Sequence, residues 1–305
     1  MLHLANQGVA INQIHNIYEA PKSLQQQWSA RSYHGSVEHN SRAVVNRCLG
    51  YWDANPTTLI PLSPEDCAPL YVEMMGGARP ILTKGRGLYD QGKYRHAQEI
   101  LNKLVHAEPQ NQEASDMLAD VFEQIGYQKE SPGVRNSFLA AAYELRNGIP
   151  GGASPQTTGP DMIRAMTTQL WLDFLGIRLD SKKAEGQAFK INLVTPDNGG
   201  QFVVELSNGT LTNIEGFLAD DADLTITINR TDLEQTMMGA MTFDEQIRTG
   251  KAKLEGNREP YEQLKTMLVH FELGFEMMPG TGAADLTPQE KPFQAEPPAS
   301  SAGAG

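Results

Sequence analysis

The 305-residue sequence has only two cysteines, Cys48 and Cys67, and lacks an apolar run long enough to cross a bilayer. Such a run takes about 20 residues, so we expect no membrane-spanning segment. The spacing of the two thiols fits neither a zinc knuckle nor a redox pair, and we expect both side chains to be buried. So few cysteines do not indicate a cellular compartment.

Basic residues are also scarce: 25 lysines and arginines stand against 37 aspartates and glutamates, for a formal net charge of −12. Nucleic-acid phosphates and anionic membrane surfaces both attract clustered lysine and arginine, so neither partner is expected. The sequence also contains no glycine-rich phosphate loop, nucleophile elbow or zinc-protease helix. It therefore predicts no complete active site.

Residues 1–54 have the apolar spacing of helices separated by loops. The expected helices cover residues 2–20, 23–31 and 37–49. Ser36 is a good N-cap for the last of them. No capping residue precedes the first, and we therefore expect the chain to be part of a longer protein.

Residues 78–146 follow a helix-turn-helix repeat of about 34 residues, of the tetratricopeptide type. Gly85 and Ala97 are small enough to let two helices approach closely, and Leu118 and Ala119 continue the register one period later. So few repeats cannot bury their apolar faces alone, because a repeat is stabilised by stacking on its neighbours. We expect flanking helices or a second subunit to cover this block.

Glycine, proline, serine and threonine dominate residues 148–160, which we interpret as a linker between domains. The periodicity then changes. An amphipathic helix is expected over residues 161–179, and Asn208-Gly209 is a strong hairpin signal. The expected strands cover residues 189–194, 201–206, 210–214, 224–228 and 251–256. Helices are expected to begin at Thr231 and Phe243, and a last helix is expected over residues 261–271. This order predicts an α+β layer fold with a helical face over a sheet.

The segment before the helix expected at Ser36 contains Tyr33, His34 and Gly35. The first turn of a helix favours an anion through its free amides and its dipole. His34 adds a hydrogen-bond donor, and Gly35 is expected to relax the backbone so that both reach one ligand. The alternative is a capped helix whose preceding histidine packs on Trp28 or Tyr33, and spacing by itself favours that alternative.

Met237, Met238 and Met241 form a methionine-rich stretch in the second half of the chain. Methionine repacks easily, so such a layer can open into an apolar tunnel in a small α+β domain. A methionine stripe is nevertheless more often part of a core. The residues leave both interpretations open.

Several runs carry a resemblance to a known family. Residues 33–44, YHGSVEHNSRAV, and residues 49–56, LGYWDANP, resemble the bacterial alkylsulfatases of the metallo-β-lactamase superfamily, which hydrolyse detergents such as dodecyl sulfate. Residues 4–8, LANQG, and residues 92–97, GKYRHA, agree as well. The resemblance covers nearly the whole chain except its tail.

Members of that family have a metallo-β-lactamase domain with two zinc ions, a helical dimerisation domain and a sterol-carrier-protein-like domain. The resemblance implies the last two here: an all-α, tetratricopeptide-like dimerisation module followed by an α+β sterol-carrier-protein-like domain. The His-x-His-x-Asp-His zinc motif is absent from the sequence. The implied divisions are residues 1–54 (edge of the missing catalytic domain and linking helices), 55–147 (dimerisation domain), 148–160 (linker), 161–280 (sterol-carrier-protein-like domain) and 281–305 (disordered tail).

The resemblance also implies roles for individual residues. The family's loop histidine contacts the sulfate group of the substrate, and His34 occupies that position, with Tyr33 as a neighbour in the same site. The second domain is implied to hold the alkyl chain, with candidate pocket residues Trp171, Phe174, Met237 and Met241. No metal ligand or cofactor is expected in this chain, because the two zinc ions belong to the absent domain.

We therefore expect a fragment of an alkyl sulfate ester hydrolase that supplies dimerisation, sulfate contact and alkyl-chain binding, and that is inactive by itself. Its expected partners are a second copy, an alkyl sulfate or other amphiphilic small molecule, and the missing metallo-β-lactamase domain. The main alternative is a stand-alone, non-catalytic lipid or sulfate-ester binding protein, while a helical-repeat scaffold leaves the α+β domain unexplained. The family is often exported to the periplasm or secreted, but this sequence indicates no compartment.

Overall fold

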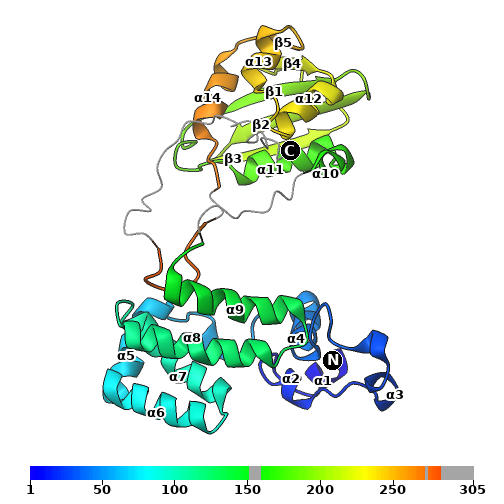
Figure 1. Cartoon of the computed structure of the whole chain (residues 1–305). Helices are drawn as coiled ribbons and strands as arrows, with labels where there is room; N and C mark the ends of the chain where they lie inside the picture. Colours follow the sequence, from blue (N-terminus) through cyan, green and yellow to red (C-terminus); the bar gives the residue numbers. More distant parts are fainter. Residues whose placement is uncertain (151–158, 272–273, 283–305) are drawn as a thin grey trace, which may run out of the picture. The chain divides into compact units, whose positions relative to one another are not determined.

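The computed structural model describes residues 1–150, 159–271 and 274–282 (Figure 1). It divides into a helical unit, with residues 1–150 and 274–282, and an α+β unit, with residues 159–271. The expected fold class, a helical module followed by an α+β domain, is confirmed. Within these three stretches, no helix has the length and apolarity needed to span a membrane. Most of the expected linker (148–160) and tail (281–305) lies outside the described residues.

The first 36 residues form isolated helical turns instead of the two helices that we expected. The turns are α1 (Leu2–Ala5), α2 (Ile14–Ile17), α3 (Lys22–Gln25) and the 3-10 turn η1 (Trp28–Ala30). The helix expected over residues 2–20 is wrong because Gly8 adopts a left-handed φ of 87°, which ends the first turn. The third expected helix is confirmed as α4 (Val37–Leu49), where Ser36 Oγ accepts a hydrogen bond from the His39 amide at 3.1 Å.

The repeat pattern expected over residues 78–146 is confirmed by the last four of the helices that follow α4. The elements after α4 are η2 (Pro56–Thr58), α5 (Pro64–Met74), α6 (Ala78–Asp90), α7 (Tyr94–Ala107), α8 (Gln112–Tyr127) and α9 (Pro132–Asn147). Gly85 permits the close approach of α6 and α7, because a Cβ there would lie 3.0 Å from Leu101 Cδ2. Ala97, Leu118 and Ala119 are fully buried in the same core.

Glu144 of α9 fixes residues 274–282 on the helical unit. Its Oε1 atom accepts hydrogen bonds from the amides of Met277 and Met278 at 2.7 and 2.8 Å and from Thr281 Oγ1 at 2.6 Å. The side chain is buried, so these three donors replace the water that the carboxylate loses on folding. Residues 274–280, which we expected at the end of the second domain, thus pack on the helical unit.

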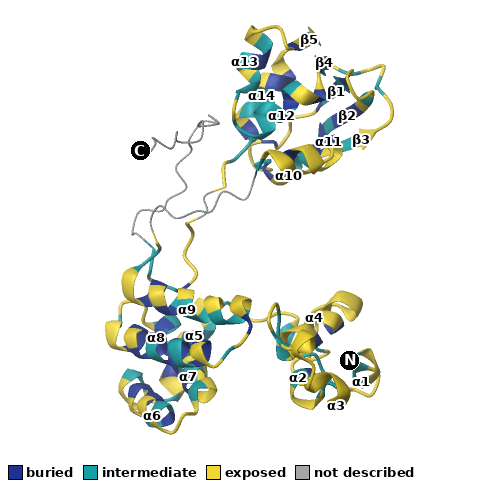
Figure 2. Ribbon diagram, turned by 45° about the vertical axis from the view of Figure 1, so that its right-hand side comes forward, coloured by how far each residue is buried: buried dark blue, intermediate teal, exposed yellow. Residues whose placement is uncertain are grey.

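Both cysteines are more exposed than we expected, so the prediction of two buried thiols is wrong. Cys48 lies on the exposed outer side of α4, and Cys67 in α5 is half-buried. The neighbouring apolar residues Val44 and Leu49 are exposed as well, and Figure 2 shows the exposed surface of α1–α4. The physical reason is that no described element covers this side of α4.

The α+β unit begins with two helices instead of one. They are α10 (Pro160–Ala165) and α11 (Thr168–Ile177), so the single helix expected over residues 161–179 is wrong. Thr167 is extended between them, and its Oγ1 atom accepts a hydrogen bond from the Leu170 amide at 3.1 Å. A threonine in this role starts a new helix.

Five strands form one sheet in the order β3-β2-β1-β4-β5. The strands are β1 (Phe189–Thr195), β2 (Gly200–Ser207), β3 (Thr210–Glu215), β4 (Leu224–Ile228) and β5 (Ala252–Gly256). β1 and β4 are parallel and the other pairs are antiparallel. The expected hairpin joins β2 to β3, with left-handed φ values of 51° at Asn208 and 69° at Gly209, as a two-residue primed turn requires.

The remaining helices are α12 (Arg230–Met237), α13 (Phe243–Arg248) and α14 (Glu259–Met267). Alternate residues of β1, namely Phe189, Ile191 and Leu193, form a core with Leu172 of α11 and Leu233 of α12. This alternation places the apolar side chains on the helical face of the sheet. The last helix ends at residue 267, four residues before the end that we expected at residue 271.

We predict that Glu144→Gln lowers the free energy of unfolding of the helical unit by about 1–3 kcal/mol, because one charged acceptor serves three donors. Hydrogen exchange is the measurement, and the amides of Met277 and Met278 should exchange faster than in the wild type. Glu113→Gln, an exposed glutamate on α8, is the control. Unchanged protection of Met277 and Met278 in Glu144→Gln would contradict the assigned role.

Candidate functional site

The segment that carries His34 is at the surface of the helical unit, directly before α4. His34 and Tyr33 are exposed, and so is Trp28, one of the two residues on which the alternative interpretation packs the histidine. Ser36 caps the helix, and the first-turn amides of α4 lie beside the loop. The side chains of His34 and Tyr33 are thus accessible from solvent, and their sulfate-contact role stays a prediction.

Gly35 has a different role from the one that we expected. It is not among the glycines with left-handed φ, so it does not relax the loop through a special backbone conformation. A Cβ at this position would instead lie 2.8 Å from Asn40 Oδ1 and 2.9 Å from Asn40 Nδ2. Glycine therefore makes room for the Asn40 side chain, which folds back from the first turns of α4.

Ion pairs hold this loop on both of its sides. Before it, Arg31 Nη2 lies 2.6 Å from Glu130 Oε1. After it, Glu38 in the first turn of α4 pairs with Arg95 of α7 and Lys129 of the α8–α9 turn, each at 3.3 Å. The run GKYRHA was noted for its resemblance and for the repeat residue Ala97, and no sequence signal indicated that Arg95 reaches Glu38.

The charges of these partners also decide the ionisation of Glu38. Burial raises the pKa of the Glu38 carboxyl, but the positive charges of Lys129 and Arg95 outweigh burial and place the pKa below its ordinary value. Glu38 is therefore a paired carboxylate. Unpaired, it would repel an anion bound at the same helix end.

A hollow of about 310 Å³ adjoins this ion pair. Its lining residues are Gly92, Lys93, Tyr94, Arg95, His96, Ile125, Gln128 and Lys129. Two of the cationic residues, Arg95 and Lys129, are the partners of Glu38. The structure thus brings the family-like run of residues 92–97 close to the family-like run of residues 33–44.

The four candidate alkyl-binding residues have different environments in the α+β unit. Trp171 and Met237 pack against its core, Met241 is half-buried, and Phe174 is exposed. Arg230 lies next to Met237, and its Nη1 atom donates to Met237 Sδ at 3.0 Å. Its Nη2 atom donates to backbone carbonyls at the end of α10. Sequence analysis did not anticipate this buried arginine beside the methionine layer.

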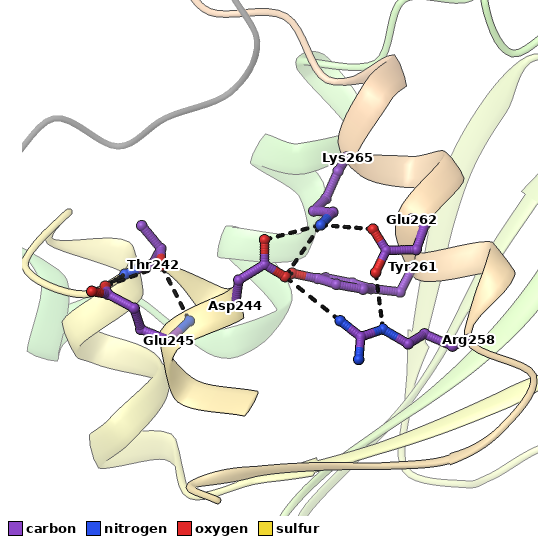
Figure 3. A network of polar contacts seen from close by, with 7 residues as sticks. All are labelled: Thr242, Asp244, Glu245, Arg258, Tyr261, Glu262 and Lys265. Atoms are coloured by element: carbon purple, nitrogen blue, oxygen red, sulfur yellow. Dashed lines mark hydrogen bonds and ion pairs between the residues drawn. The ribbon is translucent and has the colours of Figure 1, made fainter. Parts of the chain in front are cut away.

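A cluster of titratable groups links α13 to α14 (Figure 3). Asp244 accepts a hydrogen bond from Tyr261 Oη at 2.8 Å and pairs with Lys265 Nζ at 3.0 Å, while Arg258 pairs with Glu262 at 2.9 Å. Burial raises the pKa of the Asp244 carboxyl, but the bonds from Lys265 and Tyr261 bring it below its ordinary value. Burial and the nearby carboxylate raise the pKa of the Tyr261 phenol. Because these charges are mutually paired, the cluster is structural.

The described residues contain no group of three or more His, Cys, Asp or Glu side chains that would hold a metal ion. The resemblance places its two zinc ions in a different domain, so this finding does not test them. We assign no metal to the described residues.

Comparison with known proteins follows the two units. One family model, Alkyl sulfatase dimerisation, matches residues 10–148, and a second, Alkyl sulfatase C-terminal, matches residues 156–280. Part of the chain also matches the solved structure of palmitated SCP2L2 from Aedes aegypti, at 19% identity and a TM-score of 0.28, over 35% of this chain and 99% of that chain.

Longer relatives match both units together. The chain is 38% identical to a linear primary-alkylsulfatase of Pseudomonas sp, over 91% of this chain and 41% of that protein. It is 37% identical to the alkyl/aryl-sulfatase BDS1 of Saccharomyces cerevisiae, over 93% of this chain and 43% of that protein. The solved structure of the stereoselective inverting sec-alkylsulfatase Pisa1 from Pseudomonas sp. is 36% identical, with a TM-score of 0.78 over 89% of this chain and 43% of that chain.

The chain therefore spans less than half the length of these relatives. Both matching models describe parts of one family, and together they cover most of the chain. The chain belongs to the alkylsulfatase family and corresponds to its dimerisation and C-terminal domains.

Proposed function

We propose that this chain takes part in the hydrolysis of alkyl sulfate esters, and that it supplies sulfate contact, alkyl-chain binding and homodimerisation to an alkylsulfatase. The observation that carries the proposal is the exposed His34 at the start of α4, inside the region matched by the dimerisation model. The names of the relatives support the substrate class. The two zinc ions implied by the resemblance would be held by other residues, in a metallo-β-lactamase domain.

The sulfate contact is proposed at the start of α4. The imidazole of His34 is a hydrogen-bond donor, and the first-turn amides of α4 add the positive end of the helix dipole. Tyr33 is exposed beside His34 and has a phenol that donates to an anion. The ion pairs of Glu38 offset the one negative charge in that turn.

The alkyl chain is proposed to bind in the α+β unit. Met237 and Met241 lie at and just after the end of α12, and Trp171 packs on the same core as Met237. Methionine side chains rearrange at low cost to admit an apolar ligand. Exposed Phe174 on α11 extends the apolar surface beyond this layer.

We predict that the purified 305-residue chain does not hydrolyse dodecyl sulfate, with or without added zinc, because we assign to it binding and dimerisation only. Sulfate release is the measurement, and a full-length alkylsulfatase in the same assay is the control. Zinc-dependent release of sulfate by this chain would contradict the assignment.

We predict that His34→Ala weakens binding of octyl sulfate by about tenfold, the effect expected for one charge-assisted hydrogen bond. The measurement is an NMR titration that follows the histidine side chains, with octanol as the ligand that lacks the anion. His3→Ala, an exposed histidine in α1, is the matched control. Equal affinities of the two variants would remove His34 from the site.

We predict that Met241→Asp weakens binding of decyl sulfate by about tenfold, because a charge in the methionine layer opposes burial of the alkyl chain. Calorimetric titration is the measurement. Met162→Asp, at an exposed methionine of α10, is the control and should change the affinity by less than about twofold. Equal losses in both variants would argue against a pocket at Met241.

A further inference from the structure

One exposed part of the helical unit carries six large apolar side chains within 16 residues of sequence. We call this part, formed by the chain before α5 and the outer side of α5, the α5 surface. Ile60 is 89% exposed and Met74 is 79% exposed. The members of the α5 surface are Leu59, Ile60, Leu62, Leu70, Tyr71 and Met74. Apolar side chains left exposed in such numbers mark a place where another molecule binds.

The helix α5 is apolar on two sides, and only one of them has a partner among the residues that the structure describes. Ala68 and Val72 are buried on the side that packs against α7. Leu70 and Met74 are four residues apart, so they lie on a common face, and both are exposed. Burial within the described chain therefore explains one side of α5 and leaves the other unexplained.

The matched family model indicates what covers this side. It is described as a dimerisation domain and spans residues 10–148, which include the whole α5 surface. On α6–α9 the only exposed large apolar residues are Tyr127 and Tyr143, which carry hydroxyl groups. The unit has further exposed apolar side chains in residues 1–54, which carry the His34 loop, and at Phe275 and Met277. The helices α1–α4 lie away from α5 (Figure 1).

The α5 surface also has the composition of an interface. Its apolar centre is bordered by exposed Glu65 and Glu73 and by Lys103, whose Nζ lies 5.0 Å above the Tyr71 ring. A hollow of about 220 Å³, lined in part by Leu62, Cys67 and Lys103, adjoins it and provides a concave part. An apolar centre with a polar border is typical of homodimer interfaces.

We propose that the α5 surface is the homodimer interface, and that it packs against the same surface of a second copy around a two-fold axis. This inference rests on the homodimer of the proposed function and adds its location. In a two-fold interface the same patch meets itself, so one amphipathic helix with an exposed apolar side supplies both halves.

The test is sedimentation equilibrium of the full chain over a range of concentrations. The wild type is expected at twice the monomer mass of 33.5 kDa. Leu70→Glu is expected to raise the dissociation constant at least about 100-fold, because the buried charge appears twice in each dimer. Met74→Glu is a second variant on the same surface, and circular dichroism verifies that each variant is folded.

Matched controls separate this surface from other exposed leucines. Leu170 on α11 is 54% exposed and Leu70 is 55% exposed, so Leu170→Glu places the same charge on an equally exposed helix position. Leu49→Glu tests the surface of residues 1–54 in the same way, at a leucine that is 64% exposed. Both controls are expected to remain dimeric.

The outcomes distinguish the location from the dimer itself. Folded Leu70→Glu and Met74→Glu monomers beside dimeric controls support the proposal. Dimeric Leu70→Glu, or a monomer produced by Leu49→Glu or Leu170→Glu, overturns the location while the homodimer stands. A monomeric wild type at micromolar concentration overturns both, and it leaves the His34 and Met241 binding tests unaffected.

Discussion

Glu38 occupies the first turn of α4, where Arg95 of α7 and Lys129 of the α8–α9 turn reach it. Each pair is partly exposed and weak by itself, but Arg31 and Glu130 add a second tie on the other side of the same loop. The loop with His34 is thereby anchored to helices that have their own core. The same cations neutralise the carboxylate closest to the proposed sulfate position, so one network serves both the position and the electrostatics of the loop.

The two units build their cores by different means. In the α+β unit, alternating strand residues and the helices above them cover one another in a single core. In the helical unit, small residues such as Gly85 let the repeat helices pack closely, but α4 and α5 keep exposed apolar sides. A stack of few repeats leaves such ends uncovered unless a neighbour supplies the missing layer.

Two carboxylates connect parts of the chain that are far apart in sequence. Glu144 binds residues 277–281, and Asp197 of the β1–β2 turn accepts hydrogen bonds from the amides of Arg230 and Thr231 at 2.6 and 3.1 Å. Asp197 thus satisfies amides at the start of α12. Burial raises the pKa of the Asp197 carboxyl, but these bonds bring it below its ordinary value. Both carboxylates therefore accept hydrogen bonds from backbone amides of distant segments.

Local signals in the sequence determined the fold class, the Asn208-Gly209 hairpin, the Ser36 cap and the repeat helices around Gly85, because each depends on residues close in the chain. The family-like runs also pointed to His34. Its side chain is exposed, and its predicted contact with sulfate stays a prediction. Only the tertiary structure decided that Gly35 makes room for Asn40, that Glu38 meets Arg95 and Lys129, and that Cys48 is exposed. The reason is physical: packing space, ion pairing and burial depend on which distant segments come together, and periodicity along the chain does not record that.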